Sequence, residues 1–140
     1  MALCAAIAWA AARIAPPRLA DMPIPAAFGA ALVAAGIALN VLPKLHFRRA
    51  GTPVNPLRPQ AATRRVENGL HRYSRNPMYL GHALILLGLA MLLRNALALI
   101  VVPVYMTYVT RFQILAEERA LRARFGAAYL DYCRRVRRWL

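Results

Sequence analysis

The feature that most constrains this chain is a run of nineteen residues, 24–42, that contains no charged side chain. A helix of that length reaches about 28 Å, close to the ~30 Å hydrocarbon core of a bilayer. Shorter apolar stretches occupy residues 2–15, 78–93 and 95–110. Overall, 60% of the residues are hydrophobic and 17% are charged, whereas soluble domains average roughly 45–50% and 25%. The sequence therefore predicts an all-α integral membrane protein with about four transmembrane helices.

The shorter stretches need flanking interfacial residues, such as Tyr79 and Tyr108, to complete a crossing. The connection at Arg94 and Asn95 is short enough to require antiparallel neighbours, which predicts a tight helical hairpin. Residues 2–15 lack a basic start, which favours a retained first span over a signal peptide. One membrane domain, 1–140, is expected, with two spans in 1–45, a cytoplasmic loop in 46–77, the hairpin in 78–110 and a helical, amphipathic cytoplasmic tail in 111–140.

The basic residues gather in two regions. Of the 19 Lys and Arg, eight lie between the second and third apolar stretches and eight follow the fourth. Cytoplasmic loops retain positive charge, so both regions, and with four spans both termini, are predicted to lie on the cytoplasmic side of the inner (plasma) membrane. The formal net charge of +14 then reflects orientation and attraction to anionic headgroups rather than nucleic-acid binding. Segments 43–77 and 111–140 are expected to meet at this face.

The loop ends in the dense polar and aromatic stretch HRYSRNPMYLGH at residues 71–82. Loops of this length in compact proteins are usually functional or disordered, and the aromatic and basic anchors favour a functional loop. Proline suits the first turn of a helix, so Asn76-Pro77 is predicted to begin the third one. The N–H groups of residues 78–80 would then carry the positive end of the helix dipole, which favours a ligand carboxylate there.

The acidic pair Glu117-Glu118 accounts for two of only five acidic residues in the chain. Residues 111–126 read as a helix that continues from the fourth stretch, with Gly126 as a left-handed cap. Either the two carboxylates pair with Arg119 and Arg122 along that helix, or one of them binds a cationic or polyhydroxylated ligand. Both interpretations stay open on spacing alone.

Residues 127–140 predict a second basic and aromatic helix, lying in the membrane interface. Its apolar positions, Tyr129, Tyr132, Val136 and Trp139, recur every three or four residues. His82, inside the third stretch, is either a functional intramembrane residue or a neutral histidine bonded to a neighbouring helix. The two cysteines have neither disulfide nor metal-site spacing, and no metal is expected.

The ordered combination of SRNPMYLG at residues 74–81, a tight hairpin and EERALRARFGAAYLDYCRRVRRW at residues 117–139 resembles a known superfamily. It is that of the isoprenylcysteine carboxyl methyltransferases and phospholipid N-methyltransferases, in particular its small bacterial members. The resemblance covers about residues 46–140. It implies an integral-membrane enzyme that uses S-adenosylmethionine without a soluble Rossmann-type domain, with the cofactor at the cytoplasmic membrane face.

The resemblance also implies which residues surround the cofactor. The Asn-Pro motif at the start of the third span would line the pocket, with help from the preceding loop. A carboxylate of the acidic pair would contact the ammonium or the ribose hydroxyls, and an arginine suits the cofactor carboxylate. The implied cofactor-binding set is Thr63, Arg64, Arg65, Val66, His71, Arg75, Asn76, Pro77, Met78, Tyr79, Glu117 and Glu118.

Two positions depart from the family pattern. Many members have histidine before the proline, where this chain has Asn76, which cannot titrate, so no acid–base role is expected there. The prenyl-cysteine enzymes of eukaryotes place a substrate-reading arginine where this chain has Gln113, which argues against a prenyl-cysteine substrate. Arg111 is the candidate replacement.

The expected reaction is an in-line methyl transfer to a lipophilic acceptor that offers a carboxylate, an amine or a thiol. Such a transfer depends on holding the reacting atoms ~3–3.5 Å apart and in line. The catalytic candidates are His71 and Glu118, as proton acceptors, and Arg111. The alternative is a non-catalytic membrane or lipid-binding protein with a degenerate site. A sterol-type membrane reductase is disfavoured because its nicotinamide cofactor needs more room and more spans.

Overall fold

The computed structural model describes residues 6, 9–10, 25–49, 69–94 and 96–140. Most of the predicted first span and most of the predicted loop, including the candidate residues Thr63, Arg64, Arg65 and Val66, lie outside these ranges. The described residues form helices and no strand, as the sequence predicts. The elements are α2 (Ala26–Arg49), η2 (Gly69–Arg72), α3 (Pro77–Leu92), α4 (Ala96–Val109), η3 (Thr110–Ile114) and α5 (Leu115–Arg135).

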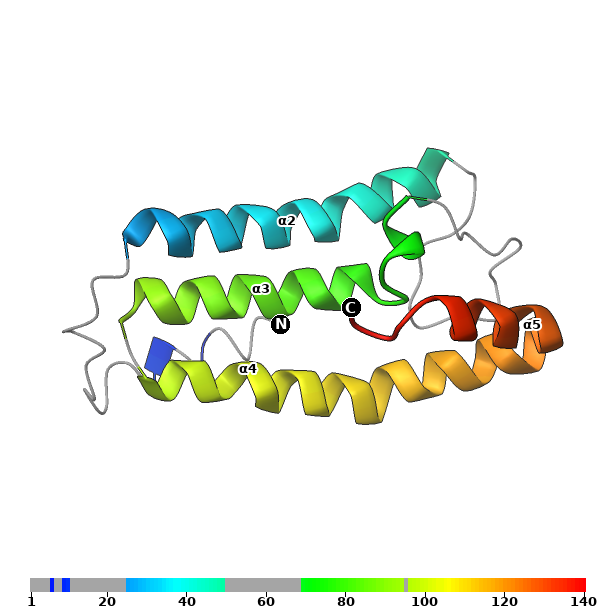
Figure 1. Ribbon diagram of the computed structural model, residues 1–140. Helices are drawn as coiled ribbons and strands as arrows, with labels where there is room; N and C mark the ends of the chain where they lie inside the picture. Colours follow the sequence, from blue (N-terminus) through cyan, green and yellow to red (C-terminus); the bar gives the residue numbers. More distant parts are fainter. Residues whose placement is uncertain (1–5, 7–8, 11–24, 50–68, 95) are drawn as a thin grey trace.

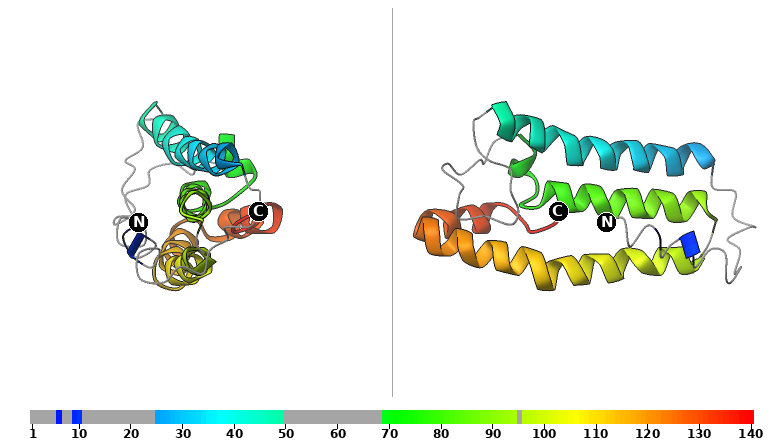
Figure 2. Two further views of the ribbon diagram at one scale, coloured as in Figure 1. Left: turned by 90° about the vertical axis from the view of Figure 1, so that its left-hand side faces the viewer. Right: turned by 180° about the vertical axis from the view of Figure 1, so that it is seen from behind.

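The long helices lie side by side, with α3 between α2 and α4 (Figures 1 and 2). The predicted hairpin is present as α3 and α4, and its turn contains Arg94 with a positive φ of 50°. The predicted helix start is also confirmed, since Pro77 is the first residue of α3. Local signals in the sequence therefore located these boundaries to within one or two residues.

Fewer helices qualify as membrane spans among the described residues than the sequence predicts. Within the described residues, the helical stretch Ala98–Arg135, which contains the break at Gly126, is the one long and apolar enough to cross a membrane. Ala26–Leu42 and Pro77–Leu92 are apolar but shorter. The sixteen residues of α3 span about 24 Å, less than the ~30 Å of bilayer hydrocarbon. The predicted four spans are therefore not confirmed.

Two pairs of glycines let α2 and α3 approach closely. A Cβ added at Gly36 would lie 2.5 Å from the carbonyl oxygen of Gly81, and one added at Gly88 would lie 2.6 Å from that of Gly29. Seven residues, about two helical turns, separate the glycines on each helix. Small residues at matching intervals on antiparallel helices allow this approach, as at many helix interfaces in membranes.

The helix that leaves α4 changes winding before it reaches the acidic pair. Residues Thr110–Ile114 form a π-helical turn, a feature that the sequence did not predict and that is often found at functional sites. At the start of this turn, the Thr110 hydroxyl donates a hydrogen bond of 2.6 Å to the Met106 carbonyl of α4. The turn therefore sets the direction in which the first residues of α5 project.

Gly126 turns the second half of α5 back along the molecule (Figure 1). Its φ and ψ are 52° and −128°, so the predicted helix break is present, although in a conformation other than the left-handed helical cap. Tyr129, Tyr132 and Val136 then form a buried cluster, packed by Leu121 and Phe125. The apolar side of the predicted second helix therefore packs against its own protein.

The predicted helix also ends sooner than the periodicity indicates. Val136 has an extended backbone, with φ −123° and ψ 130°, and residues 136–140, here called the C-terminal tail, leave the helix. Trp139 packs with Tyr79 and Met106 against a buried cluster that includes Leu86, Tyr105 and Ile114. Tertiary contacts thus decide the path of these last residues.

We expect Gly36→Val to destabilise the α2–α3 pair. The added side chain would force apart two backbones that are in contact, at a cost of about 1–3 kcal/mol. Thermal unfolding in detergent, followed by circular dichroism, measures the loss. Ala35→Val, at an exposed neighbour on the same helix, is the matched control, and equal unfolding temperatures for the two variants would contradict the close packing.

We expect Gly126→Ala to destabilise the turn through its backbone alone. A Cβ at this position has nothing within 4 Å, but φ and ψ of this kind cost other residues about 1–3 kcal/mol. Denaturant unfolding of the two proteins in the same detergent measures the difference. Ala127→Ser, at the exposed next residue, should leave stability unchanged. A stable Gly126→Ala protein would show that the turn is absent.

Candidate functional site

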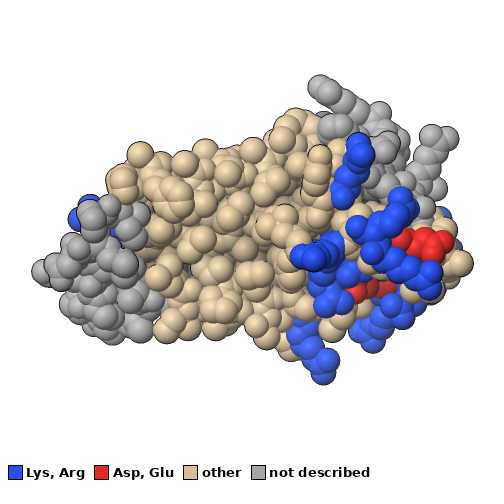
Figure 3. Space-filling view, in the orientation of Figure 1, with Lys and Arg blue, Asp and Glu red and all other residues tan. Residues whose placement is uncertain are grey.

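Charged side chains gather at one end of the molecule. In Figure 3 most of the visible basic residues and all the visible acidic ones lie over the end that contains α5, a small basic group lies at the opposite end, and the middle of this face has none. Side chains of α5, the start of α3 and the C-terminal tail meet here. The polar segments around residues 71–77 and 111–140 are therefore adjacent, as the sequence analysis expects.

Glu118 lies at the centre of this end. Arg138 donates two hydrogen bonds to it, Nε to Oε1 at 3.0 Å and Nη2 to Oε2 at 2.8 Å. Arg75 approaches the same carboxylate, with 3.3 Å between Nη2 and Oε1. The Glu118 side chain is only 15% exposed. The hydrogen bond to Glu118 is also the main cause that raises the pKa of Arg138 above its ordinary value.

The tail is also held by main-chain groups. The Arg75 amide donates to the Arg137 carbonyl at 3.0 Å, and the Asn76 side-chain amide donates to the Arg138 carbonyl at 3.0 Å. The Ser74 hydroxyl accepts a hydrogen bond from the backbone N–H of Asn76. The same hydroxyl donates to the Arg138 carbonyl at 3.4 Å. The Asn76 side chain is thus engaged in docking the tail.

Glu117 lies in a separate hydrogen-bond group. Its Oε1 accepts a hydrogen bond of 2.7 Å from the Tyr79 hydroxyl and one of 3.3 Å from the Gln113 amide. Burial raises the pKa of Glu117 above its ordinary value, and the bonds from Tyr79 and Gln113 partly offset this by lowering it. Within the part of the chain that the structure describes, Oε2 accepts no hydrogen bond. Glu117 therefore keeps one carboxylate oxygen for a ligand.

Arg75 contributes a second incompletely satisfied group. One of its terminal nitrogens contacts Cys133 Sγ and the other pairs with Glu118. Its buried Nε has no hydrogen-bond partner among the described residues. The cluster of Arg75, Arg138 and Glu118 holds two guanidinium groups and one carboxylate, a formal charge of +1, which favours a nearby anionic group.

The remaining predicted residues are distributed around this end. The His71 carbonyl accepts a hydrogen bond of 2.8 Å from the Tyr132 hydroxyl. Pro77 is buried, and the Met78 carbonyl faces α2, where the Asn40 amide lies 3.4 Å away. Arg111 is not part of the ion-pair cluster. The structure thus brings together Arg75, Asn76, Tyr79, Glu117 and Glu118, and the sequence analysis missed Tyr132 and Arg138.

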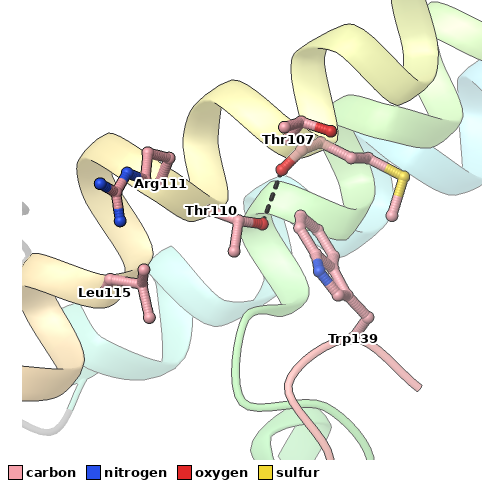
Figure 4. A pocket seen from close by; sticks show the side chains of 6 residues that line it. Thr107, Thr110, Arg111, Leu115 and Trp139 are labelled. Atoms are coloured by element: carbon pink, nitrogen blue, oxygen red, sulfur yellow. Dashed lines mark hydrogen bonds between the residues drawn. The ribbon is translucent and has the colours of Figure 1, made fainter.

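Arg111 lies instead at a groove of about 380 Å³ between the α4–η3 helix and the C-terminal tail. Figure 4 shows Trp139 of the tail on one side and Thr110 and Arg111 of the helix on the other. The groove is lined by Met106, Thr107, Thr110, Arg111, Leu115 and Trp139. Apart from Arg111 and the two threonines, this lining is apolar.

His82 joins the three long helices. Its Nε2 contacts the Asn40 amide nitrogen, and its Nδ1 lies 3.1 Å from the Tyr105 hydroxyl. With the amide as donor, Nε2 accepts and Nδ1 carries the proton, which is the neutral imidazole. Of the two interpretations of His82, the structure favours a neutral histidine bonded to neighbouring helices.

We expect Glu118→Gln to destabilise the protein far more than Asp131→Asn. The first change leaves two half-buried guanidinium groups facing a neutral amide, which costs about 2–4 kcal/mol. The second removes an exposed ion pair with Arg134, whose side chains are 82% and 64% exposed, worth at most ~1 kcal/mol. Both variants replace one acid of α5 by its amide, and chemical unfolding in detergent compares them. Equal losses would contradict a structural role for the Glu118 cluster.

Comparisons with known proteins identify the family of this chain. The family model described as phospholipid methyltransferase matches residues 24–128, a range that takes in α2, α3, α4 and the acidic pair Glu117-Glu118. A Haemophilus influenzae protein described as uncharacterized is 43% identical over 63 residues, which are 45% of this chain and 100% of that protein. No solved structure matches. The family match covers about three quarters of the sequence, so this chain belongs to the phospholipid methyltransferase family.

Proposed function

We propose that this protein is an S-adenosylmethionine-dependent methyltransferase that acts on a lipophilic acceptor at the cytoplasmic face of the inner membrane. Family membership supports methyl transfer and a lipid-like substrate. The observation that carries the proposal further is the hydrogen bond between Tyr79, at the start of α3, and Glu117 of α5. It joins the two motifs that the resemblance assigns to the cofactor, although 38 residues separate them.

The side chains at this end fit the charges of S-adenosylmethionine. The cofactor carries an ammonium and a sulfonium, and Glu117 offers a half-buried carboxylate with one oxygen that accepts no hydrogen bond from the described residues. It also carries a carboxylate, which suits the net positive cluster around Arg75 and the positive end of the α3 dipole. The aromatic ring of Tyr79 suits a sulfonium or an adenine. When bound, the cofactor supplies an electrophilic methyl group, whose bond to sulfur breaks as the acceptor bonds to carbon.

The two acidic residues have different roles in this proposal. Glu118 uses both oxygens in its bonds with Arg138 and Arg75, so we assign it to positioning the tail. Glu117 is assigned to the cofactor ammonium or ribose hydroxyls. Tyr79 and Gln113 hold the Glu117 carboxylate in a fixed orientation, which lowers the entropy that binding must remove. His71 remains the candidate base that takes the proton from a methyl acceptor that loses one.

We expect Glu117→Gln to weaken S-adenosylmethionine binding about 10- to 100-fold, the effect of losing a bond to a charged group. Calorimetric titration of the purified protein in detergent measures the affinity. Asp131→Asn removes an exposed carboxylate of the same helix and should bind as the wild type does. An intact protein that binds no cofactor at all would favour the alternative of a non-catalytic lipid-binding protein.

The pH dependence of that affinity supplies a sharper test. The ionised form of Glu117 is required to pair with an ammonium, so affinity should be lost as the pH falls through the pKa of Glu117. Burial raises that pKa above the ordinary value of 4.5, and the loss should therefore begin at a higher pH than for an exposed carboxylate. Glu117→Gln should remove this pH dependence, and its persistence in that variant would assign the titration to another group.

A further inference from the structure

His82 is a polar side chain in the apolar part of α3, and the proposed function gives it no role. It follows Tyr79 by three residues, and every other residue from Leu80 to Leu92 is apolar. A polar ring in such a segment costs free energy unless its nitrogens are hydrogen-bonded. The two helices that flank α3 supply these bonds.

Both ring nitrogens of His82 are engaged by side chains that are themselves buried. Nε2 contacts the Asn40 amide of α2, and Nδ1 lies 3.1 Å from the Tyr105 hydroxyl of α4. In this neutral form Nε2 accepts and Nδ1 donates, so neither nitrogen offers a lone pair to a substrate proton. These contacts favour a role in positioning other groups over a role as a base.

On the α2 side, Asn40 contacts α3 at two successive turns. Its amide donates to the Met78 carbonyl at 3.4 Å as well as to His82. The backbones are closest at the same level, since a Cβ added at Gly81 would lie 3.1 Å from the Asn40 backbone nitrogen. The glycine contact sets how near the two helices lie, and the Asn40 bonds set which side of α3 faces α2.

On the α4 side, Tyr105 ties His82 to the packing around Tyr79. Tyr105 belongs to the buried cluster against which Tyr79 packs. The His82 ring lies edge-on to both tyrosines, with its centroid 6.4 Å from that of Tyr79 and 6.3 Å from that of Tyr105. Tyr79 and His82 share one face of α3 because three residues separate them. A rotation of α3 that broke the bond to Tyr105 would therefore also move Tyr79.

The direction of the Tyr79 side chain matters because its hydroxyl donates the 2.7 Å hydrogen bond to Glu117, and such bonds weaken steeply with misalignment. We propose that His82 is a positioning residue for Glu117. Its bonds to Asn40 and Tyr105 fix the rotation of α3 and thereby aim the Tyr79 hydroxyl at the Glu117 carboxylate. The consequence for cofactor binding rests on the proposed function, whereas the coupling between these side chains does not.

The coupling is tested without a cofactor by carbon-13 NMR of the glutamate carboxyl groups. The chain has three glutamates, so Glu117→Gln identifies the signal of Glu117 in labelled protein. The bond from Tyr79 lowers the pKa of Glu117, against the burial that raises it. Tyr79→Phe should therefore raise the titration midpoint of that signal by about 0.5–1 pH units.

Two changes to the partners of His82 should move the same signal in the same direction. Tyr105→Phe removes one hydroxyl and should raise the Glu117 midpoint by less than Tyr79→Phe does. Asn40→Leu, a change of similar size, removes the bonds on the α2 side and should also raise it. Tyr108→Phe removes a hydroxyl that is largely exposed on the same helix as Tyr105 and should leave the midpoint unchanged. An unaltered midpoint in Tyr105→Phe, or equal changes in Tyr105→Phe and Tyr108→Phe, would overturn the proposal.

Calorimetric titration with S-adenosylmethionine tests whether this positioning reaches the cofactor. Tyr105→Phe should weaken binding about 3- to 10-fold in the otherwise wild-type protein. In the Glu117→Gln background the same change should weaken it less than about twofold, because both changes act through one carboxylate and are not additive. Equal factors in the two backgrounds would show an effect that bypasses Glu117 and would overturn the positioning role. A wild-type protein that binds no cofactor would overturn the proposed function instead, and the NMR result would still decide the coupling.

Discussion

The Glu118 carboxylate is the interaction on which the rest of this end of the molecule depends. It binds Arg138 of the C-terminal tail through two hydrogen bonds and Arg75 through a third contact. The Glu118 carboxylate is largely buried between two guanidinium groups, and removing one of these charged partners leaves the desolvation cost of the others uncompensated. This cluster fixes the tail against the start of α3, and so it fixes the neighbouring groups that we assign to ligands.

Packing along the helices places these groups at the same level. The glycine contacts between α2 and α3 set the position of α3, and the buried cluster around Leu86 and Tyr105 sets α4 beside it. Since α4, η3 and the first half of α5 form one continuous helix, the apolar surface of α4 leads directly to the acidic pair. A lipophilic substrate and a water-soluble cofactor require such a boundary between apolar and charged surface.

The charged end and the groove beside η3 both involve the C-terminal tail. Glu117 bonds with Tyr79 at the charged end, and Arg111 lines the neighbouring groove together with Trp139 of the tail. The tail contributes Arg138 to the first region and Trp139 to the second, so consecutive residues contact both. The position of the C-terminal tail therefore affects both regions. The turn at Gly126 brings the chain back so that the tail can reach them.

The sequence by itself determined the helical fold class, the hairpin, the start of α3 at Pro77 and the break at Gly126, because apolar length, proline and glycine act over a few residues. It also placed the acidic pair near the Asn-Pro motif, through charge asymmetry and family resemblance. Only the tertiary structure decided that Glu118 pairs with Arg75 and Arg138 rather than with Arg122 along its own helix. It likewise decided that η3 is a π-helix and that Tyr129 and Tyr132 face the protein. These outcomes depend on contacts between distant segments, which helical periodicity does not encode.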